Sequence, residues 1–493
     1  MSEEYEEDDE GYNTSPEKAE DENYRNFKEE PGDDDGENRR PEIRNSMIYT
    51  SLLVVKGMIG AGILNLPLIV KRFGIIGSIA IGFFLDFIAI SVAYLLGRCK
   101  DITQRYSYAV YSKLAWGYVG SMIIKICLIV NLSTLAIVQL IVFGSVLDGL
   151  STLIYKIENG KYFILAIAIL IMPCMFQKDI SGITKYAYFG IIGIGVFFAS
   201  TIILFIDKYL KGETYFSKDM FYPKEDVSID LFILVGGYYN AFTFHMGYFV
   251  YYLPLKPRNN KNMIKSTIIG STTTTLIYLS YGIISYFIFG DKIEDSALIY
   301  LKTELDEANM KKDILRIVVV VISFISFLIN ASMSTMIHFY MFKSHFIGLI
   351  KFIIKKISEK KEIENEKEPI PLVDIKDEKK EEEKKVEEVT SSANEFKEKE
   401  YLSGFAQNIL TLACYIYVVI MALSFAKIII LDNFNGATVA NYINWIAPCL
   451  FFLIFSWGKK YYKEQVFAVV IGIFGIILVL LYFISFFVKA PQK

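Results

Sequence analysis

The residues best suited to chemistry lie in the first apolar segment of the sequence. Residues 56–67 read Lys-Gly-Met-Ile-Gly-Ala-Gly-Ile-Leu-Asn-Leu-Pro, so three glycines fall within six residues and a proline follows. Glycine weakens a helix, and Pro67 lacks the backbone N–H that a helix interior needs. A helix interrupted here exposes N–H groups at the start of its second half, which suit a substrate carboxylate. Close packing of the glycines between helices is the alternative.

A second stretch of this kind lies near the middle of the chain. Residues 236–245 read Gly-Gly-Tyr-Tyr-Asn-Ala-Phe-Thr-Phe-His, with polar and aromatic side chains in an otherwise apolar segment. Non-helical backbone at membrane depth is tolerated only where it faces protein or a water-filled cavity. The first and sixth helices correspond when five helices repeat with inverted topology. Two matching interruptions therefore predict a solute site near the bilayer midplane.

Three ionisable side chains are candidates for ion coupling. Lys56 lies inside an apolar segment, where a charged residue indicates function; the alternative is a side chain that reaches the nearby membrane surface. Asp86 lies midway along the second apolar segment, where it can pair with Lys56, carry a proton or make a polar contact between helices. His245 adjoins the second interruption, and imidazole suits a proton relay, although a hydrogen-bonded structural histidine fits equally.

These residues need a scaffold, and the composition predicts one that spans a membrane. The chain has 493 residues, of which 53% are hydrophobic, and its mean hydropathy is +0.37. The apolar residues fall in runs of about 20, the length that crosses a bilayer. We expect an all-α polytopic membrane protein of about eleven transmembrane helices, at residues 47–72, 74–97, 119–147, 161–176, 183–206, 230–253, 263–289, 313–341, 403–431, 442–457 and 464–488.

The segments outside these runs are strongly charged. Residues 1–46 hold about 18 acidic and about 6 basic side chains, which predicts a disordered acidic tail. Helices 1–8 then occupy residues 47–342 and helices 9–11 residues 403–488, with a Lys/Glu-rich loop at 343–402 between them. About 22 basic residues flank the helices on the side of the N-terminus and about 14 on the other, so the tail and the loop are predicted to be cytoplasmic. The basic body suits contact with a lipid bilayer, not with nucleic acid.

The residues around the two interruptions resemble the amino acid/auxin permease family, most closely its proton-coupled and vacuolar branches. The resemblance covers residues 47–488 without the charged loop, and it implies the five-plus-five inverted-repeat, LeuT-like fold of the amino acid–polyamine–organocation superfamily, with discontinuous first and sixth helices. It is carried by residues 55–67 with Lys-Arg-Phe-Gly at 71–74, by residues 241–244 with Leu253, Pro254 and Asn259, and by Ile-Phe-Gly at 288–290.

The resemblance also implies roles for single residues. The break in the first helix is expected to bind the carboxylate of an amino acid, and the break in the sixth helix is expected to bind its amine. The third and eighth helices are expected to complete the pocket. The implied substrate-binding residues are Ile59, Gly60, Ala61, Gly62, Asn240, Ala241, Phe242, Thr243, Asn131 and Ser332, with Ser133, Asn330 and Ser334 nearby.

The position of Lys56 bears on the coupling ion. It is similar to that of an asparagine near the sodium site of sodium-coupled relatives, and a fixed cation there repels Na⁺. The proton-coupled branch often has a histidine three residues before this lysine, where the chain has Leu53. The route of the proton therefore stays open, and Asp86 has no counterpart in the resemblance.

The sequence thus predicts a secondary active transporter, a symporter of amino acids that is proton-coupled or sodium-independent. It is expected in the plasma membrane or in an acidic organelle. A transporter-like amino acid sensor that signals through the tail and the loop is the alternative. A channel lacks support because no selectivity-filter repeat occurs. An enzyme lacks support because no metal-ligand spacing, cofactor motif or nucleophile–base pair is seen. The amino acid and the protein partners of the tail and loop are left open.

Overall fold

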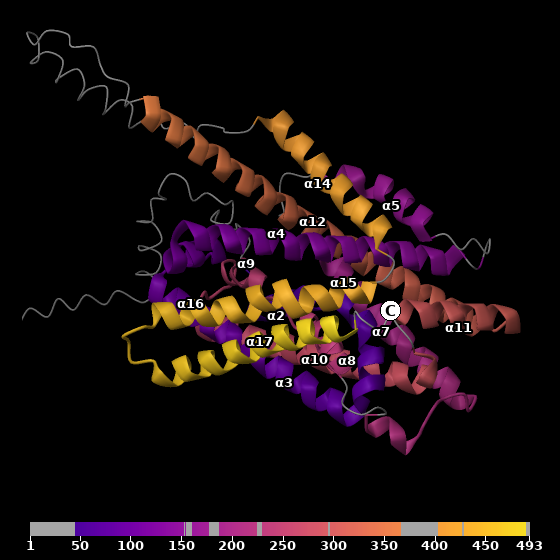
Figure 1. Ribbon diagram of the computed structural model, residues 1–493. Helices are drawn as coiled ribbons and strands as arrows, with labels where there is room; N and C mark the ends of the chain where they lie inside the picture. The colour runs from indigo at the N-terminus through magenta and orange to yellow at the C-terminus, as the bar shows by residue number, and fades with distance from the viewer. Residues whose placement is uncertain are drawn as a thin grey trace, which may run out of the picture. The chain divides into compact units, whose positions relative to one another are not determined.

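The computed structural model describes residues 45–151, 153, 160–176, 187–223, 229–293, 296–365, 403–425 and 428–489, and this part of the chain is helical (Figure 1). Eight of its helices are long and apolar enough to cross a membrane, and two shorter apolar helices accompany them. The predicted all-α membrane-spanning class is therefore confirmed, whereas the count of eleven spans stays a prediction. Most of the predicted acidic tail and residues 366–402 of the charged loop lie outside the described residues.

The described helices follow the predicted apolar segments, with shifts at their ends. Glycines at positive φ kink two of them, α3 at Gly74 and α4 at Gly117, so α3 joins the end of the first predicted span to the second. In chain order the principal helices are α2 (Met47–Met58), α3 (Leu66–Thr103), α4 (Tyr108–Ser151), α5 (Gly160–Met175), α7 (Ala187–Leu210), α8 (Ile229–Asn240), α10 (Asn260–Phe289), α11 (Ala297–Lys311), α12 (Ile314–Asn365), α14 (Gly404–Ser424), α15 (Ile428–Asn435), α16 (Ala447–Phe455) and α17 (Tyr462–Lys489).

Long helices from distant parts of the sequence pack together. The helix α12 lies along α4 and α7, whereas α10 lies along α2 and α3. Figure 1 shows α5 and α14 beside α4, and it shows the path from α15 to α16 turning back into α17 as a hairpin. The pairs α2 with α10 and α4 with α12 place the first, third, seventh and eighth predicted spans around the interrupted segments.

The first predicted helix is discontinuous, as expected. The helix α2 ends at Met58, Ile59 is extended, and Gly60 has φ −121° and ψ −143°. The chain continues as the 3₁₀ turn η1 (Ala61–Asn65) before α3 begins with Pro67 in its first turn. Proline is tolerated there because the first N–H groups of a helix have no partner within it.

The sixth predicted helix is broken at the matching place. The helix α8 ends at Asn240, residues 241–244 are not helical, and the chain resumes as η3 (His245–Gly247) and α9 (Tyr248–Tyr252). The preceding glycines lie inside α8 and not in the break. An ideal Cβ built on Gly236 would lie 2.8 Å from the carbonyl oxygen of Asn433. These glycines therefore permit close packing of α8 against α15.

The tenth helix takes a path that differs from the predicted one. The predicted spans leave residues 432–441 between helices, but α14 ends at Ser424 and a helical path runs from α15 through two π-helical segments, η5 (Gly436–Ala440) and η6 (Tyr442–Ile446), into α16. π-Helical turns are rare and frequent at functional sites. The hydropathy is misleading here because the path buries several polar side chains: Asp432, Asn433, Asn435, Asn441 and Asn444.

Ion pairs join the end of α7, the middle of α11 and the start of α12 on the predicted outer side. Arg316 lies 2.6 Å from both Asp207 and Glu213, and Lys208 lies 2.5 Å from Glu304. The hydrogen bond from Arg316 holds the pKa of Glu213 below its usual value. Arg316 and Glu304 are buried, and a buried charge is costly unless it is paired. This cluster fixes the three helices relative to one another.

The close crossing of the broken sixth helix and the tenth helix can be tested at Gly436. An ideal Cβ there would lie 2.0 Å from the carbonyl oxygen of Gly236 and 2.8 Å from Cβ of Asn240. We expect Gly436→Ala to lower the melting temperature of the detergent-purified protein, because overpacking costs about 1–3 kcal/mol. Gly195→Ala in α7 is the matched control, since a Cβ there meets nothing within 4 Å. Equal melting temperatures of the two variants would contradict the crossing.

Candidate functional site between the two broken helices

The two breaks lie side by side. An ideal Cβ on Gly62 would lie 3.2 Å from Cβ of Ala241, so the unwound segments approach each other directly. Tyr278 of α10 joins them, because its hydroxyl lies 2.7 Å from the carbonyl oxygen of Met58 and 3.1 Å from that of Ala241. A tyrosine hydroxyl has one proton to donate, which it shares between the two carbonyls. Tyr278 thereby ties the first break to the second.

A buried carboxylate from the tenth helix contacts the same region. Asp432 is 2% exposed and accepts hydrogen bonds from the side-chain amides of Asn65, at 2.8 Å, and Asn240, at 2.6 Å. Asn65 ends η1 and Asn240 ends α8, so one carboxylate connects the ends of both broken elements. Within the described part of the chain, no basic residue pairs with Asp432. A buried carboxylate in a membrane protein indicates function, and this one can take up a proton.

The amide oxygens around Asp432 add to its acceptor character. Oδ1 of Asn65 and Oδ1 of Asn240 are buried, and neither has a hydrogen-bond donor among the described residues. An acceptor without a donor is costly inside a protein. The carboxylate and the two amide oxygens therefore form a region suited to a group that donates hydrogen bonds.

Two amides of α4 face the interrupted segments. Gln139 is buried, and an ideal Cβ on Gly60 would lie 3.4 Å from its Nε2, so its amide N–H group reaches the unwound backbone. Asn131 accepts a hydrogen bond of 2.8 Å from Asn435, and its Nδ2 lies 3.3 Å from Sδ of Met246. Asn131 therefore links α4 to the tenth helix and to the segment that follows the second break.

Most of the predicted substrate-binding residues come together. Phe242 is buried, with its ring edge-on to Tyr238 and Tyr278, and the hydroxyl of Thr243 donates to the carbonyl of Asn240. Ser332 differs, because its hydroxyl donates to Leu328 one turn earlier in its own helix. The roles of all the predicted residues in substrate binding stay predictions. The residues that form the two neighbouring breaks or end α8 are Ile59, Gly60, Ala61, Gly62, Asn240, Ala241, Phe242 and Thr243.

Lys56 is buried and held by the eighth predicted helix. Its ammonium donates to Oδ1 of Asn330 at 2.5 Å and to Oγ of Ser334 at 2.7 Å, both in α12. Its side chain packs against Gly190 of α7, where an ideal Cβ would lie 2.7 Å from Cε of Lys56. Lys56 thus lies between three helices and does not extend to the membrane surface.

Asp86 does not pair with Lys56. Its carboxylate accepts hydrogen bonds from the hydroxyls of Ser271 and Thr272 in α10, the second at 3.1 Å. The pairing considered from the sequence is therefore wrong, because Asn330 and Ser334 supply the partners of Lys56 instead. The contact made by Asp86 is the polar contact between helices that the sequence left open.

His245 starts the short turn after the second break and is fully buried. Its Nε2 lies 2.8 Å from the carbonyl oxygen of Ala89 in α3. A carbonyl only accepts, so Nε2 carries the proton, and Nδ1 has no partner among the described residues. This bond gives His245 a structural role, and its role in proton transfer stays a prediction.

Four residues of this region are absent from the predicted site: Asn65, Gln139, Tyr278 and Asp432. The sequence holds one signal for Asp432, an acid among four asparagines between two apolar runs. It holds none for Tyr278, which is one of 33 tyrosines. The partners of Asp432 are separated from it by 367 and 192 positions, so only the folded chain reveals the cluster.

A comparison with protein families finds a match over most of the chain. The family described as "Transmembrane amino acid transporter protein" matches residues 44–488. The chain belongs to this family, a group of transporters and not of enzymes, and the predicted family relationship is confirmed. It is a multi-pass integral membrane protein.

Individual relatives are more distant. "Amino acid transporter AVT6E" of Arabidopsis thaliana is 23% identical over 269 residues, which cover 52% of this chain and 55% of that protein. "Amino acid transporter AVT1J" of the same plant is 23% identical over 272 residues, which cover 54% of this chain and 62% of that protein. The chain thus spans less than two thirds of these relatives. A structure of Mhp1, a nucleobase-cation-symport-1 family transporter, is 14% identical with a TM-score of 0.49, covering 92% of this chain and 94% of that chain.

The hydroxyl of Tyr278 can be tested by its removal. We expect Tyr278→Phe to lower the melting temperature, because unpairing a buried carbonyl costs about 1–3 kcal/mol. Tyr248→Phe is the matched control, since the Tyr248 hydroxyl is buried without a partner among the described residues. Thermal unfolding in detergent measures both variants. A Tyr278→Phe variant as stable as Tyr248→Phe would show that the two breaks do not depend on this hydroxyl.

Proposed function

We propose that this protein is a secondary active transporter of amino acids that binds its substrate between the two broken helices. The observation that carries the proposal is the meeting of the unwound segments at Gly62 and Ala241. An amino acid carries both a carboxylate and an ammonium group. The N–H groups at the start of η1 suit the carboxylate, and the carbonyl oxygens at the end of α8 suit the ammonium. The family and the names of both plant relatives support the substrate class.

The proposed binding residues are those of the two breaks, from Ile59 to Gly62 and from Asn240 to Thr243. Gln139 adds an amide beside Gly60. Asn131 supports the pocket through its contacts with Asn435 and Met246. Ser332 is a weaker candidate, since its hydroxyl is bonded to its own helix.

The proposal includes transport without sodium. Na⁺ is bound in proteins by oxygen ligands. Two oxygens of α12, Oδ1 of Asn330 and Oγ of Ser334, already accept hydrogen bonds from the ammonium of Lys56. Two positive charges 4 Å apart repel each other by about 4 kcal/mol at an effective dielectric constant of about 20. Lys56 therefore occupies this place as a fixed cation.

The coupling ion in this proposal is the proton, and Asp432 is the group that takes it up. As a carboxylate, Asp432 accepts from both Asn65 and Asn240. A protonated carboxyl donates through one oxygen, and this oxygen is a weaker acceptor for the amide N–H that faces it. Protonation thus weakens the link from the tenth helix to one of the two breaks. Asp86 and His245 are the alternative proton carriers. Asp86 bonds hydroxyls of α10 and His245 bonds the carbonyl of Ala89 in α3, so neither of these bonds joins the two breaks.

Uptake by the purified protein in liposomes tests the function. With a panel of radiolabelled amino acids and an inward proton gradient, we expect accumulation of at least one of them. Accumulation should persist when Na⁺ is replaced by choline, because Lys56 fills the place of a sodium ion. Protein-free liposomes are the control. Binding of an amino acid without flux would overturn the transporter and favour a sensor, and loss of uptake in choline would contradict the role given to Lys56.

The proton carrier can be identified in the same assay. We expect Asp432→Asn to abolish accumulation driven by a pH gradient while exchange of amino acid at equal pH continues, since asparagine keeps the shape but cannot take up a proton. Asp86→Asn and His245→Ala serve as comparison variants and should retain accumulation. Accumulation by Asp432→Asn equal to that of the unmodified protein would exclude Asp432. Loss confined to Asp86→Asn or His245→Ala would assign the proton to that residue.

A further inference from the structure

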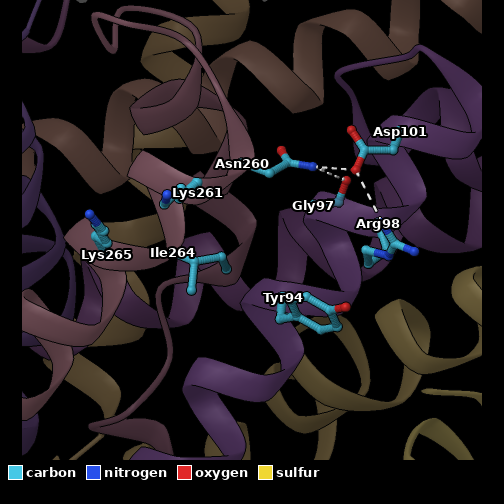
Figure 2. A pocket seen from close by; sticks show the side chains of 8 residues that line it. All are labelled: Tyr94, Gly97, Arg98, Asp101, Asn260, Lys261, Ile264 and Lys265. Carbon is cyan, nitrogen blue, oxygen red and sulfur yellow. Dashed lines mark hydrogen bonds and ion pairs between the residues drawn. The ribbon is translucent and has the colours of Figure 1, made fainter. Parts of the chain in front are cut away.

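A pocket lies between α3 and α10, away from the two breaks. It opens where α3 ends and α10 begins, which is the predicted cytoplasmic side of the membrane. Its cavity has a volume of about 290 Å³. Figure 2 shows the side chains of α3 on one side and those of α10 on the other, and the lining residues are Tyr94, Gly97, Arg98, Asp101, Asn260, Lys261, Ile264 and Lys265.

Cations outnumber anions in this pocket. The lining holds three basic side chains, those of Arg98, Lys261 and Lys265, and one carboxylate, that of Asp101. Asp101 is already engaged, because it accepts a hydrogen bond of 2.6 Å from Asn260 and lies 3.8 Å from Arg98. Lys261 and Lys265 are exposed and have no ion pair within the described part of the chain. The pocket therefore keeps a net positive charge with two available ammonium groups.

The wall of the pocket is well fixed on the side of α3. The guanidinium of Arg98 lies over the ring of Tyr461, 4.8 Å from its centroid, and its buried Nε has no hydrogen-bond partner among the described residues. Asn260 also donates to the carbonyl of Gly97 at 2.9 Å. The cationic side chain of Arg98 is thus held in place beside the pocket, and its Nε–H group can still donate a hydrogen bond.

An apolar surface adjoins the cations toward the membrane interior. Tyr94 lies one helical turn deeper than Arg98 and below it in Figure 2, and Ile264 lines the pocket beside Lys261 and Lys265. One or two helical turns deeper, Phe87 of α3 and Ile268 of α10 are exposed, and in a membrane such side chains face lipid tails. Cations above a lipid-facing apolar surface match a phosphate group that carries acyl chains.

We propose that this pocket binds the headgroup of an anionic phospholipid of the cytoplasmic leaflet, with its phosphate held by Arg98, Lys261 and Lys265. The acyl chains then lie along Tyr94, Ile264 and the apolar surface beneath them. A free phosphate ion shares the headgroup chemistry but gains nothing from that surface. Such a lipid bridges α3 and α10, and this assignment is independent of the transported substrate.

Lipid binding to the purified full chain in neutral detergent tests the site. Native mass spectrometry measures binding of dioleoylphosphatidylserine and of dioleoylphosphatidylcholine, and the melting temperature is recorded with each lipid and with inorganic phosphate. We expect the serine lipid to bind and to raise the melting temperature. The choline lipid and inorganic phosphate at the same concentration should have little effect. Equal stabilisation by inorganic phosphate, or equal binding of the two lipids, would overturn the proposal.

Matched pairs of lysine variants localise the binding. Lys261→Ala with Lys265→Ala should weaken binding of the serine lipid by about fivefold for each lysine removed. Lys459→Ala with Lys460→Ala removes the same charge from exposed positions on the same predicted face, outside the pocket, and should leave binding unchanged. All four lysines are exposed, so the melting temperatures without lipid should agree. Equal weakening by both pairs would show general surface attraction and refute the pocket.

Discussion

Every backbone N–H and C=O group inside a membrane needs a partner within the protein, because lipid offers none. The two broken helices create such groups near Met58 and Ala241, and the hydroxyl of Tyr278 lies within reach of both carbonyls. Asp432 accepts hydrogen bonds from the side-chain amides of Asn65 at the end of η1 and Asn240 at the end of α8. The unwound segments can therefore persist only because helices far away in the sequence supply side chains to them. This requirement places α10 and the tenth helix around the site.

Buried charges in this protein have two kinds of partner, opposite charges or neutral polar groups. On the predicted outer side, Arg316 pairs with Asp207 and Glu213, so opposite charges hold helix ends together. Near the breaks, Lys56 and Asp432 are each held by neutral amides or hydroxyls. A charge held by neutral dipoles can change protonation without leaving an opposite charge unpaired. The first arrangement suits a fixed structure. The second lets Asp432 gain and lose a proton in the proposed transport cycle, in which Lys56 stays a fixed cation.

The helix α10 takes part in several of these features. Its middle carries Tyr278, which joins the two breaks, and Ser271 and Thr272, which bond Asp86 of α3. Its beginning carries Lys261 and Lys265, which line the pocket against the end of α3. A movement of α10 relative to α3 would change all three places together. The proposed contact of a lipid with both helices would therefore influence the proposed substrate site from the membrane.

The sequence by itself determined the membrane-spanning class, the two breaks and the burial of ionisable groups near them. Apolar run length and the backbone preferences of glycine and proline are local properties, so they can be read along the chain. The tertiary structure decided the partners. Lys56 bonds Asn330, which is 274 positions away, and Asp432 bonds Asn65, 367 positions away. It also decided the path of the tenth helix, because buried asparagines lower the hydropathy of residues 432–441 until the stretch resembles a loop. No local pattern specifies which distant side chains will satisfy a buried polar group, since this depends on how the helices pack.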